Sequence, residues 1–443
     1  MKRPSLGSSM AITIAGNGVI SLFWLVSGML AARLLGPVGR GELAAIQTWG
    51  LFIATIALLG MPDALVYFTA RQPDRSASYS VSAVLLALLG GLPLLGLGYL
   101  AMPLLLSAQN AAVVAEARFY LLIGITAMVG QVPLNALRGQ SDFVVWNTLR
   151  IVGTVLGLVP LVLAWLLNHR TAEYVATMHL VFWGTAYSAV TLLVLVWRVP
   201  GPYRAKLGDW KPMLSFGLPS MMTVLPQNLN LRLDQMLMAA LFAPRLLGFY
   251  VVAVAWAAIL APLFQAISIV VFPHIAAHQL RDKQASTLAG ILRLGIPLAV
   301  VAATGLATLT PIGIPLIFGR RFAAAEAPAV VLVFAGAILA INQMIEEGLR
   351  GLGAPKAVMW SELGGFVVTL GLLALLLKPM GIMGAAIASL LGYGTVAFQL
   401  LYWARELTGY HLSTMLFPSG SEVVEVFSRA RLWIKDLHGA TAE

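Results

Sequence analysis

A group of polar residues interrupts one of the most apolar parts of the chain. The segment 226–235 carries Asn228, Arg232 and Asp234 among leucines. In a regular helix Arg232 and Asp234 point about 160° apart, so they cannot pair with each other and each needs another partner. Either the helix bends at Pro226 and lines a wet cavity, or these residues bond to neighbouring spans. The density of polar groups favours the cavity, so we count Asn228 among the predicted substrate-binding residues.

Two further arginines lie within predicted membrane helices. Arg150 and Arg293 sit roughly 8 to 10 Å into apolar stretches at the rise of an α-helix. A charge at mid-membrane costs about 2.5 to 3.5 kcal/mol on insertion scales, so each needs a partner or water. A guanidinium offers paired donors to phosphate oxygens, and we predict that Arg150, Arg232 and Arg293 bind an anionic substrate. Ion pairs between spans are the alternative role for any one of them.

Carboxylate residues, like the arginines, occur within predicted membrane spans. Asp63, Asp234, Glu346 and Glu362 fall within predicted spans. Such groups could take up the ion that drives transport, or they could pair with arginines of neighbouring spans. The residues alone leave both possibilities open.

Polar and small residues also form a stripe about 80° wide along the first predicted span. Its members are Thr13, Asn17, Ser21, Trp24 and Gly28. The stripe fits a cavity lining and, equally well, close helix packing through small residues. We include Asn17 among the predicted substrate-binding residues on the first interpretation.

Catalytic and metal-binding patterns are weak. His274 and His278 have the spacing of metal ligands, but Ile275 stands where the metalloprotease pattern requires glutamate. The sequence has no GxSxG, P-loop or dinucleotide motif, and it contains no cysteine. We therefore expect no enzyme activity, no catalytic residue, no metal and no cofactor.

The composition defines the elements that must position these residues. The chain is 59% hydrophobic and only 10% charged, with a mean hydropathy of +0.88. Such a composition is typical of an all-α integral membrane protein. The net charge of +10 would suggest nucleic acid in a soluble chain. Here most basic residues lie between apolar runs, so anionic membrane lipids are the expected partner and nucleic acid is not.

Apolar windows of about 20 residues predict about twelve membrane spans in two bundles of six. The predicted spans are 10–32, 43–69, 80–105, 117–137, 143–167, 174–197, 212–241, 246–273, 288–318, 327–349, 357–377 and 381–404. A polar linker, 198–211, joins the halves. We expect an N-terminal bundle at 1–203, a C-terminal bundle at 204–405 and a tail at 406–443.

The two halves share turn motifs. Leu34-Leu35-Gly36-Pro37, with Gly41 four residues after the proline, reappears about 210 residues later. The second copy is Leu241-Phe242-Ala243-Pro244, with Gly248 four residues after its proline. A second pair is Gln131-x-x-x-Asn135-Ala-Leu137-Arg138-Gly139 and Gln343-x-x-x-Glu347-Gly-Leu349-Arg350-Gly351. Internal repeats of this kind, with a central cavity between the halves, are typical of secondary transporters.

The distribution of basic residues predicts the orientation. With the N-terminus in the cytoplasm, the cytoplasmic segments hold about twice as many Lys and Arg residues as the outer segments, among which we count Arg33 and Arg40 of the first turn. This bias favours both termini inside. The first apolar stretch is too long for the core of a signal peptide, so we expect it to be retained as a span. The segment 421–437 has the pattern of an interfacial amphipathic helix, although a solvated tail fits almost as well.

The turn Arg33-Leu-Leu-Gly-Pro-Val-Gly-Arg-Gly-Glu-Leu-Ala-Ala, the polar-striped first span and the repeat resemble one family. They look like the polysaccharide-biosynthesis (Wzx-type) flippases of the multidrug/oligosaccharidyl-lipid/polysaccharide exporter superfamily. The likeness covers about residues 8 to 405. It implies alternating-access transport of polyprenyl-diphosphate-linked oligosaccharide to the outer leaflet of a bacterial cytoplasmic membrane. It also implies a V-shaped cavity between the bundles, and the polysaccharide polymerase machinery is a conceivable partner.

Two other functions compete with this one. A drug or cation antiporter of the same superfamily would need carboxylates and aromatic residues at its cavity, and Asp63, Asp234 and Glu362 are candidates. A membrane glycosyltransferase would normally carry its catalytic carboxylates on a sizeable outer loop. The predicted outer loops are short, which makes that alternative remote.

Overall fold

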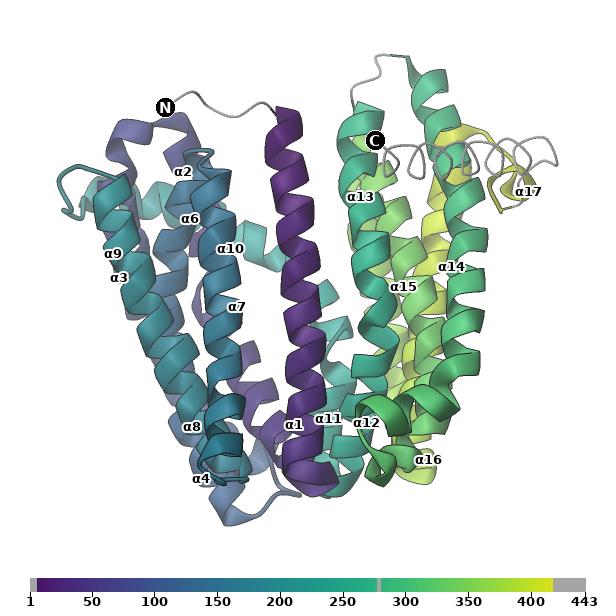
Figure 1. Ribbon diagram of the computed structural model, residues 1–443. Helices are drawn as coiled ribbons and strands as arrows, with labels where there is room; N and C mark the ends of the chain where they lie inside the picture. The colour runs from purple at the N-terminus through teal and green to yellow at the C-terminus, as the bar shows by residue number, and fades with distance from the viewer. Residues whose placement is uncertain (1–5, 277–279, 417–443) are drawn as a thin grey trace, which may run out of the picture.

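The computed structural model describes residues 6–276 and 280–416, and within these ranges every regular element is helical. The predicted amphipathic segment 421–437 lies outside the described residues. In Figure 1 the helices form two groups that meet at the lower face and diverge toward the upper face, where α1 begins.

The first half of the chain forms one of these groups, together with the start of the second half. Its elements are α1 (Leu6–Ala57), α2 (Met61–Arg71), η1 (Pro73–Arg75), α3 (Ser76–Leu105), α4 (Ala111–Tyr120), α5 (Leu122–Thr126), η2 (Ala127–Gln131), α6 (Val132–Gly139), α7 (Phe143–Leu166), α8 (Ala172–His179), η3 (Leu180–Ala186) and α9 (Tyr187–Arg198).

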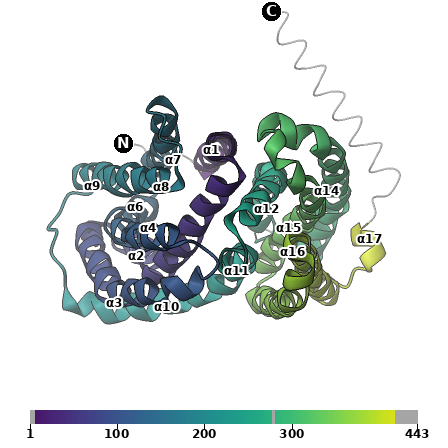
Figure 2. The same ribbon diagram turned by 90° about the horizontal axis from the view of Figure 1, so that it is seen from below.

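The second half supplies the remaining helices. They are α10 (Leu207–Asn230), α11 (Leu233–Leu241), α12 (Pro244–Ala257), η4 (Ala258–Leu260), α13 (Ala261–Ala276), α14 (Arg281–Ile317), η5 (Arg320–Ala325), α15 (Glu326–Gly351), α16 (Pro355–Thr408) and α17 (Leu412–Leu416). Figure 2 shows α1 and α12 between the two groups, with α14 and α17 at the outer edge of the second.

Two long helices bend sharply at glycine. Gly36 in α1 has a φ of 66°, and Gly381 in α16 has a φ of 57°. Glycine adopts this left-handed region without steric cost, and Pro37 beside Gly36 removes a backbone donor at the same place. Each bend therefore separates two consecutive membrane spans, as predicted for α1 from the Gly-Pro turn.

In the described ranges nine helices are long and apolar enough to cross a membrane. The bent helix α16 contains two predicted spans, 357–377 and 381–404. The bent helix α1 contains the span 10–32 and the first part of the span 43–69, which continues into α2. The predicted span 212–241 is divided into α10 and α11, which are separated at Leu231 and Arg232. The predicted spans thus fall on helices in the predicted order, and the all-α membrane fold is confirmed.

The two copies of the repeated turn pack against each other. A Cβ atom on Gly41 would lie 1.7 Å from the carbonyl oxygen of Pro244, and one on Gly248 would lie 1.9 Å from that of Pro37. Only glycine permits this approach of α1 and α12. The repeat seen in the sequence therefore forms a reciprocal contact between the halves.

Polar contacts reinforce this contact at the lower face of Figure 1. Arg33 donates from Nε to the carbonyl oxygen of Ile317, at 2.8 Å, and so caps the end of α14. Gln109 donates from Nε2 to the carbonyl oxygens of Ala239 and Phe242, at 2.8 and 2.9 Å, and so caps α11. The last carbonyls of a helix lack partners within it, so the first half satisfies two helix ends of the second half.

The helix α10 belongs to the second half of the sequence but is bound to the first. Arg75 and Asp209 form an ion pair at 2.6 Å, and Ser220 donates to Asp63 of α2 at 2.7 Å. The predicted site residue Asp63 therefore joins α2 to α10. The same helix contacts α16, so it connects the two groups.

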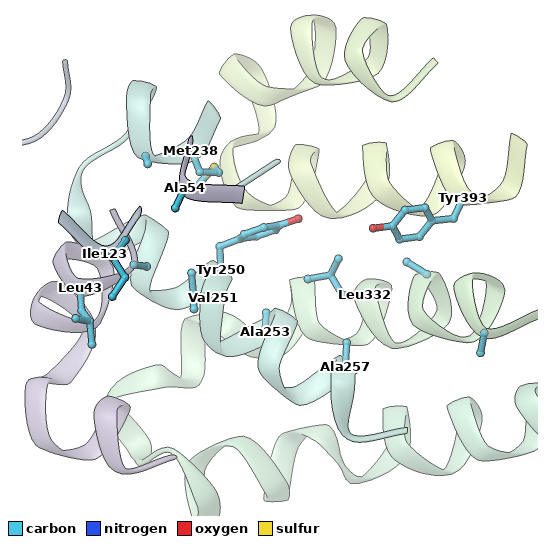
Figure 3. Close-up of a cluster of buried hydrophobic side chains, with 14 of the residues drawn as sticks. Leu43, Ala54, Ile123, Met238, Tyr250, Val251, Ala253, Ala257, Leu332 and Tyr393 are labelled. Atoms are coloured by element: carbon cyan, nitrogen blue, oxygen red, sulfur yellow. The ribbon is translucent and has the colours of Figure 1, made fainter. Parts of the chain in front are cut away.

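Apolar side chains of both halves form one buried cluster near the reciprocal turns. Figure 3 shows Leu43 and Ala54 of α1 close to Tyr250 and Val251 of α12. Tyr250 is fully buried. This shared cluster holds the halves together on one side and leaves the region beside the first part of α1 to form cavities.

Candidate functional site

A cavity of about 550 Å³ lies beside α1, between the two halves. Its lining comes from α1, α7, α8 and η3 on one side and from residues 255–262 on the other. Most of these residues are apolar or aromatic, including Trp24 and Trp183. Small-molecule sites commonly combine such walls with a few polar groups that orient the ligand.

Arg40 is the cationic residue of this cavity. The bend at Gly36 lets α1 continue as a helix, so Arg40, Leu43 and Gln47 share one face and all three line the cavity. The Nε atom of Arg40 is buried and has no hydrogen-bond partner among the described residues. An arginine in this position has donors available for an anionic ligand.

An aromatic wall stands on the α8 side. His179 and Trp183 stack with ring centroids 5.2 Å apart, and both line the cavity. The Nδ1 atom of His179 is 2.9 Å from the hydroxyl of Tyr120, which fixes the orientation of the imidazole. The lining, as far as the structure describes it, includes no Asp or Glu. The cavity therefore suits an anionic ligand with apolar and stacking contacts.

Arg150 lies at the edge of this first cavity. It is one turn from Thr154, a lining residue on the same face of α7. Its guanidinium stacks over Trp146, with Cζ 4.5 Å from the ring centroid, and donates to Asn147 Oδ1 at 3.1 Å. Asn147 in turn donates to Thr13 of α1 at 3.0 Å. Arg150 is thus held by neutral partners and keeps its charge available.

Asn17 also lies near this cavity. It is one turn before Ser21, which lines the cavity. Its Oδ1 atom is buried and has no partner within the described ranges. Arg150 and Asn17 are therefore the two sequence-predicted binding residues that the structure brings toward the cavity.

Three other predicted binding residues lie elsewhere. Arg293 donates from Nε to the backbone oxygen of Thr414, at 2.7 Å, and so packs against α17, on the side of α14 away from α1 (Figures 1 and 2). Arg232 is exposed between α10 and α11. Asn228 is half-buried on α10. None of the three lines the cavities described here.

A second cavity, of about 470 Å³, lies between α10, α13 and α15. The lining residues that the structure describes are all polar: Gln227, Gln265, Ser268, Gln343, Glu346, Glu347 and Arg350. Arg350 forms ion pairs with Glu346, at 3.2 Å, and with Glu347. Glu346 also accepts a hydrogen bond from Gln227 at 3.4 Å.

The buried carboxylates form two separate sites in the second half. Glu346 of α15 and Glu362 of α16 are both buried, and Glu346 Oε1 and Glu362 Oε2 have no hydrogen-bond partner in the described part of the chain. Asp234 is buried and accepts from the hydroxyls of Tyr250 and Ser389. In the described part of the chain Asp234 has no cationic partner, so neutral donors alone surround it.

The fold is that of the transporters of the MOP superfamily. The structure is similar to an inward-facing multidrug resistance MATE family transporter, with a TM-score of 0.70 and 16% identity over 88% of this chain and 94% of that one. It is also similar to the lipid II flippase MurJ in an inward closed conformation, with a TM-score of 0.69 and 14% identity over 91% of this chain and 88% of that one. A eukaryotic MATE transporter gives a TM-score of 0.61 at 15% identity, covering 90% of this chain and 96% of that one.

The sequence pattern of a family described as polysaccharide biosynthesis protein matches residues 6–279. The chain belongs to this family. No curated protein sequence matches it significantly. Family and fold together show a multi-pass membrane protein of this family that shares its fold with known transporters.

The sequence prediction missed Arg40, which it placed among the residues of an outer turn. One signal was present, because Arg40, Leu43 and Gln47 have helical spacing directly after the Gly-Pro turn. Among the described residues no three His, Asp or Glu side chains gather as a metal site.

Proposed function

We propose that the protein is a flippase for polyprenyl-diphosphate-linked oligosaccharide, which it moves between membrane leaflets by alternating access. The observation that carries this proposal is the half-buried Arg40, whose Nε atom is buried and has no described partner, in a cavity whose described lining includes no carboxylate. A diphosphate is the most highly charged part of such a lipid, and arginine binds it with paired hydrogen bonds. Family membership supports the same substrate class.

We assign roles in substrate binding to residues according to their positions relative to the first cavity. Arg40 makes the direct contact, Arg150 adds positive charge at the edge of the cavity, and Asn17 offers an amide. The aromatic wall of His179 and Trp183 contacts the sugar or isoprenoid carbons next to the diphosphate. Arg232 and Asn228 come into contact with substrate only after the halves move, and Arg293 has a structural role at α17.

The carboxylates of the second half are proposed to couple transport to an ion. Asp234, with only neutral partners, and the pair Glu346 and Glu362 can each gain or lose a proton as the halves move. Asp63 is bound to Ser220 and has a structural role between α2 and α10.

The membrane placement completes the proposal. The protein resides in the bacterial cytoplasmic membrane with both termini in the cytoplasm, so the reciprocal turns lie on the outer side. The bundles 1–203 and 204–405 are the moving bodies, with α10 attached to both, and 406–443 is a cytoplasmic tail. Substrate is delivered to polysaccharide polymerase machinery on the outer side.

A drug or cation antiporter is the second candidate function. The aromatic walls and the volume of the first cavity favour it, since they suit a drug-sized ligand. The positive charge of Arg40 opposes it, because a cationic drug in this cavity would have no described carboxylate with which to pair.

The phenotype of cells that lack the gene distinguishes the flippase from the antiporter. The flippase predicts loss of a surface polysaccharide and build-up of lipid-linked oligosaccharide in the inner leaflet. The gene for the unmodified protein should restore the polysaccharide, and the gene for the Arg40→Ala variant should not. An unchanged surface glycan together with increased drug sensitivity would instead identify an antiporter.

A further inference from the structure

The second cavity has a lining of a different chemical kind from the first. Each lining residue that the structure describes is polar, although the cavity lies within a membrane-spanning bundle. Its volume of about 470 Å³ is in the range of small-molecule sites. Polar groups in a membrane are costly unless they are bonded, so a cavity of this kind indicates a polar ligand.

Several of its hydrogen-bonding groups have no protein partner. The hydroxyl of Ser268 is buried, and the side chain is only 6% exposed. A helical serine usually bonds the carbonyl four residues before it, yet this hydroxyl has no partner among the described residues. Gln265 is exposed and Gln343 is half-buried, and neither carboxamide has a protein hydrogen-bond partner within the described ranges. Three unpartnered groups thus surround one space.

The charged residues of the second cavity form ion pairs with one another. Arg350 lies between Glu346 and Glu347, and Gln227 donates to Glu346. The single guanidinium is paired with two glutamates, so the described lining offers no free positive charge to a diphosphate. The free groups are neutral amides and a hydroxyl, each able to pair with the hydroxyls of a sugar, which both donate and accept.

The position of the cavity fits the geometry of the proposed substrate. On α13, Ala261 and Pro262 line the first cavity, while Gln265 and Ser268 line the second. Pro262 and Gln265 are about 4.5 Å apart along the helix axis at the rise of an α-helix. Arg40 lies at the other end of the first cavity, because its neighbour Gly41 contacts Gly248. Gly248 and Gln265 are 17 residues apart, roughly 25 Å at the same rise, so sugars some way along the glycan would reach the second cavity from a diphosphate at Arg40.

We propose that the second cavity is the glycan subsite, where Gln265, Ser268 and Gln343 bind sugars along the glycan beyond the diphosphate and set which oligosaccharide is accepted. This inference rests on the proposed function. It assigns the two chemical parts of the substrate to two cavities: the diphosphate to Arg40 and the neutral sugars to the amides.

The internal repeat supplies a matched control. Gln131 is the repeat counterpart of Gln343, and Asn135 stands where the second half has Glu347. Gln131 lines neither cavity. Replacing Gln131 by leucine therefore makes the same chemical change at an equivalent place in the fold without touching the proposed subsite.

The test measures binding to the full-length protein in lipid nanodiscs by native mass spectrometry. One probe is undecaprenyl diphosphate without sugar. The other is the lipid-linked oligosaccharide pool extracted from host cells in which the gene is deleted. We expect Gln343→Leu and Ser268→Ala each to weaken binding of the glycan-bearing lipid about 10-fold, as for one lost hydrogen bond. Binding of undecaprenyl diphosphate should stay unchanged, which also shows that the variants are folded.

Other results separate the two proposals. If both variants bind the glycan-bearing lipid as well as the unmodified protein does, or if Gln131→Leu weakens it equally, the glycan subsite is wrong and the flippase function stands. Equal weakening for both probes also rejects the subsite. If the unmodified protein binds neither probe, the flippase function fails and the subsite fails with it.

Discussion

Arg40 lines the cavity between the halves, and its neighbour Gly41 touches Pro244 at the reciprocal contact that joins them. The residue proposed to hold the diphosphate is therefore carried by the turn on which the two halves meet. Movement of one half against the other at this contact must move Arg40 relative to the wall formed by residues 255–262. Because Arg40 and Gly41 are adjacent in the backbone, substrate binding at Arg40 is coupled to the relative position of the two halves.

Adding a methyl group at this contact should separate the halves. In Gly41→Ala or Gly248→Ala the new Cβ atom collides with a proline carbonyl, so we expect a loss of about 1 to 3 kcal/mol from overpacking. Thermal unfolding in detergent measures this loss. Spin labels on cysteines placed at the upper face of Figure 1, one on each half, should also show a changed distance distribution.

Two helical glycines without neighbours provide the control. Gly305 in α14 and Gly371 in α16 have nothing within 4 Å of the added Cβ atom. Alanine is favoured over glycine in a helix by roughly 0.5 to 1 kcal/mol, so alanine at either position should leave stability unchanged or raise it. Equal destabilisation at all four positions would mean that the reciprocal contact has no special role.

Arg40 should contribute more to diphosphate binding than any arginine predicted from the sequence. A hydrogen bond to a charged group is worth about 1.5 to 3 kcal/mol, so Arg40→Ala should weaken binding of undecaprenyl diphosphate roughly 10- to 100-fold. Arg40→Lys should keep part of the affinity, because it retains the charge but loses the paired donors. Arg293→Ala, at the contact with α17, is the control and should bind normally. Normal binding by the Arg40→Ala protein would refute the assignment.

The repeat and the bends could be predicted from sequence because they depend on local backbone chemistry. Gly36, Pro37 and Gly41 each have a conformational preference that is visible in one chain. Their counterparts in the second half made the two-part architecture evident. The seventh predicted span is divided within the polar segment 226–235, but at Leu231 and Arg232 and not at Pro226, through which α10 continues as a helix.

The binding residues could be predicted only in part, because depth in the membrane does not show which neighbour a side chain faces. Arg150 and Arg293 have similar predicted depths, yet one lies beside the first cavity and the other contacts Thr414 at the edge of the bundle. Arg40 was counted as a residue of an outer turn. Its place in the cavity depends on α1 resuming as a helix against α12, which is a tertiary contact.

Asp234 should be needed for coupling to a proton gradient and not for substrate affinity. Asp234→Asn keeps the shape of the side chain and the contacts of Tyr250 and Ser389 but removes the ionisable group. We expect transport by this variant in proteoliposomes to lose its response to an imposed pH gradient, with substrate affinity changed less than about 2-fold. Asp74→Asn, at an exposed position of η1, is the control. An undiminished gradient response would exclude Asp234 as the coupling group.

The proposed orientation can be tested with single cysteines, because the chain contains none. Pro202 lies in the exposed linker before α10, and Arg170 lies in the exposed turn before α8. A membrane-impermeant thiol reagent applied to intact cells should label a cysteine at Arg170 and not one at Pro202. The reverse pattern would place the reciprocal turns on the cytoplasmic side.

Translocation by the purified protein tests the flippase function most directly. Proteoliposomes are prepared with lipid-linked oligosaccharide from gene-deleted cells, and a membrane-impermeant glycosidase measures how fast the glycan becomes accessible. We predict that the unmodified protein speeds this exchange over protein-free liposomes, and that Arg40→Ala lowers the protein-dependent rate at least about 10-fold. If the unmodified protein gives no exchange beyond that of protein-free liposomes, the protein does not carry this substrate.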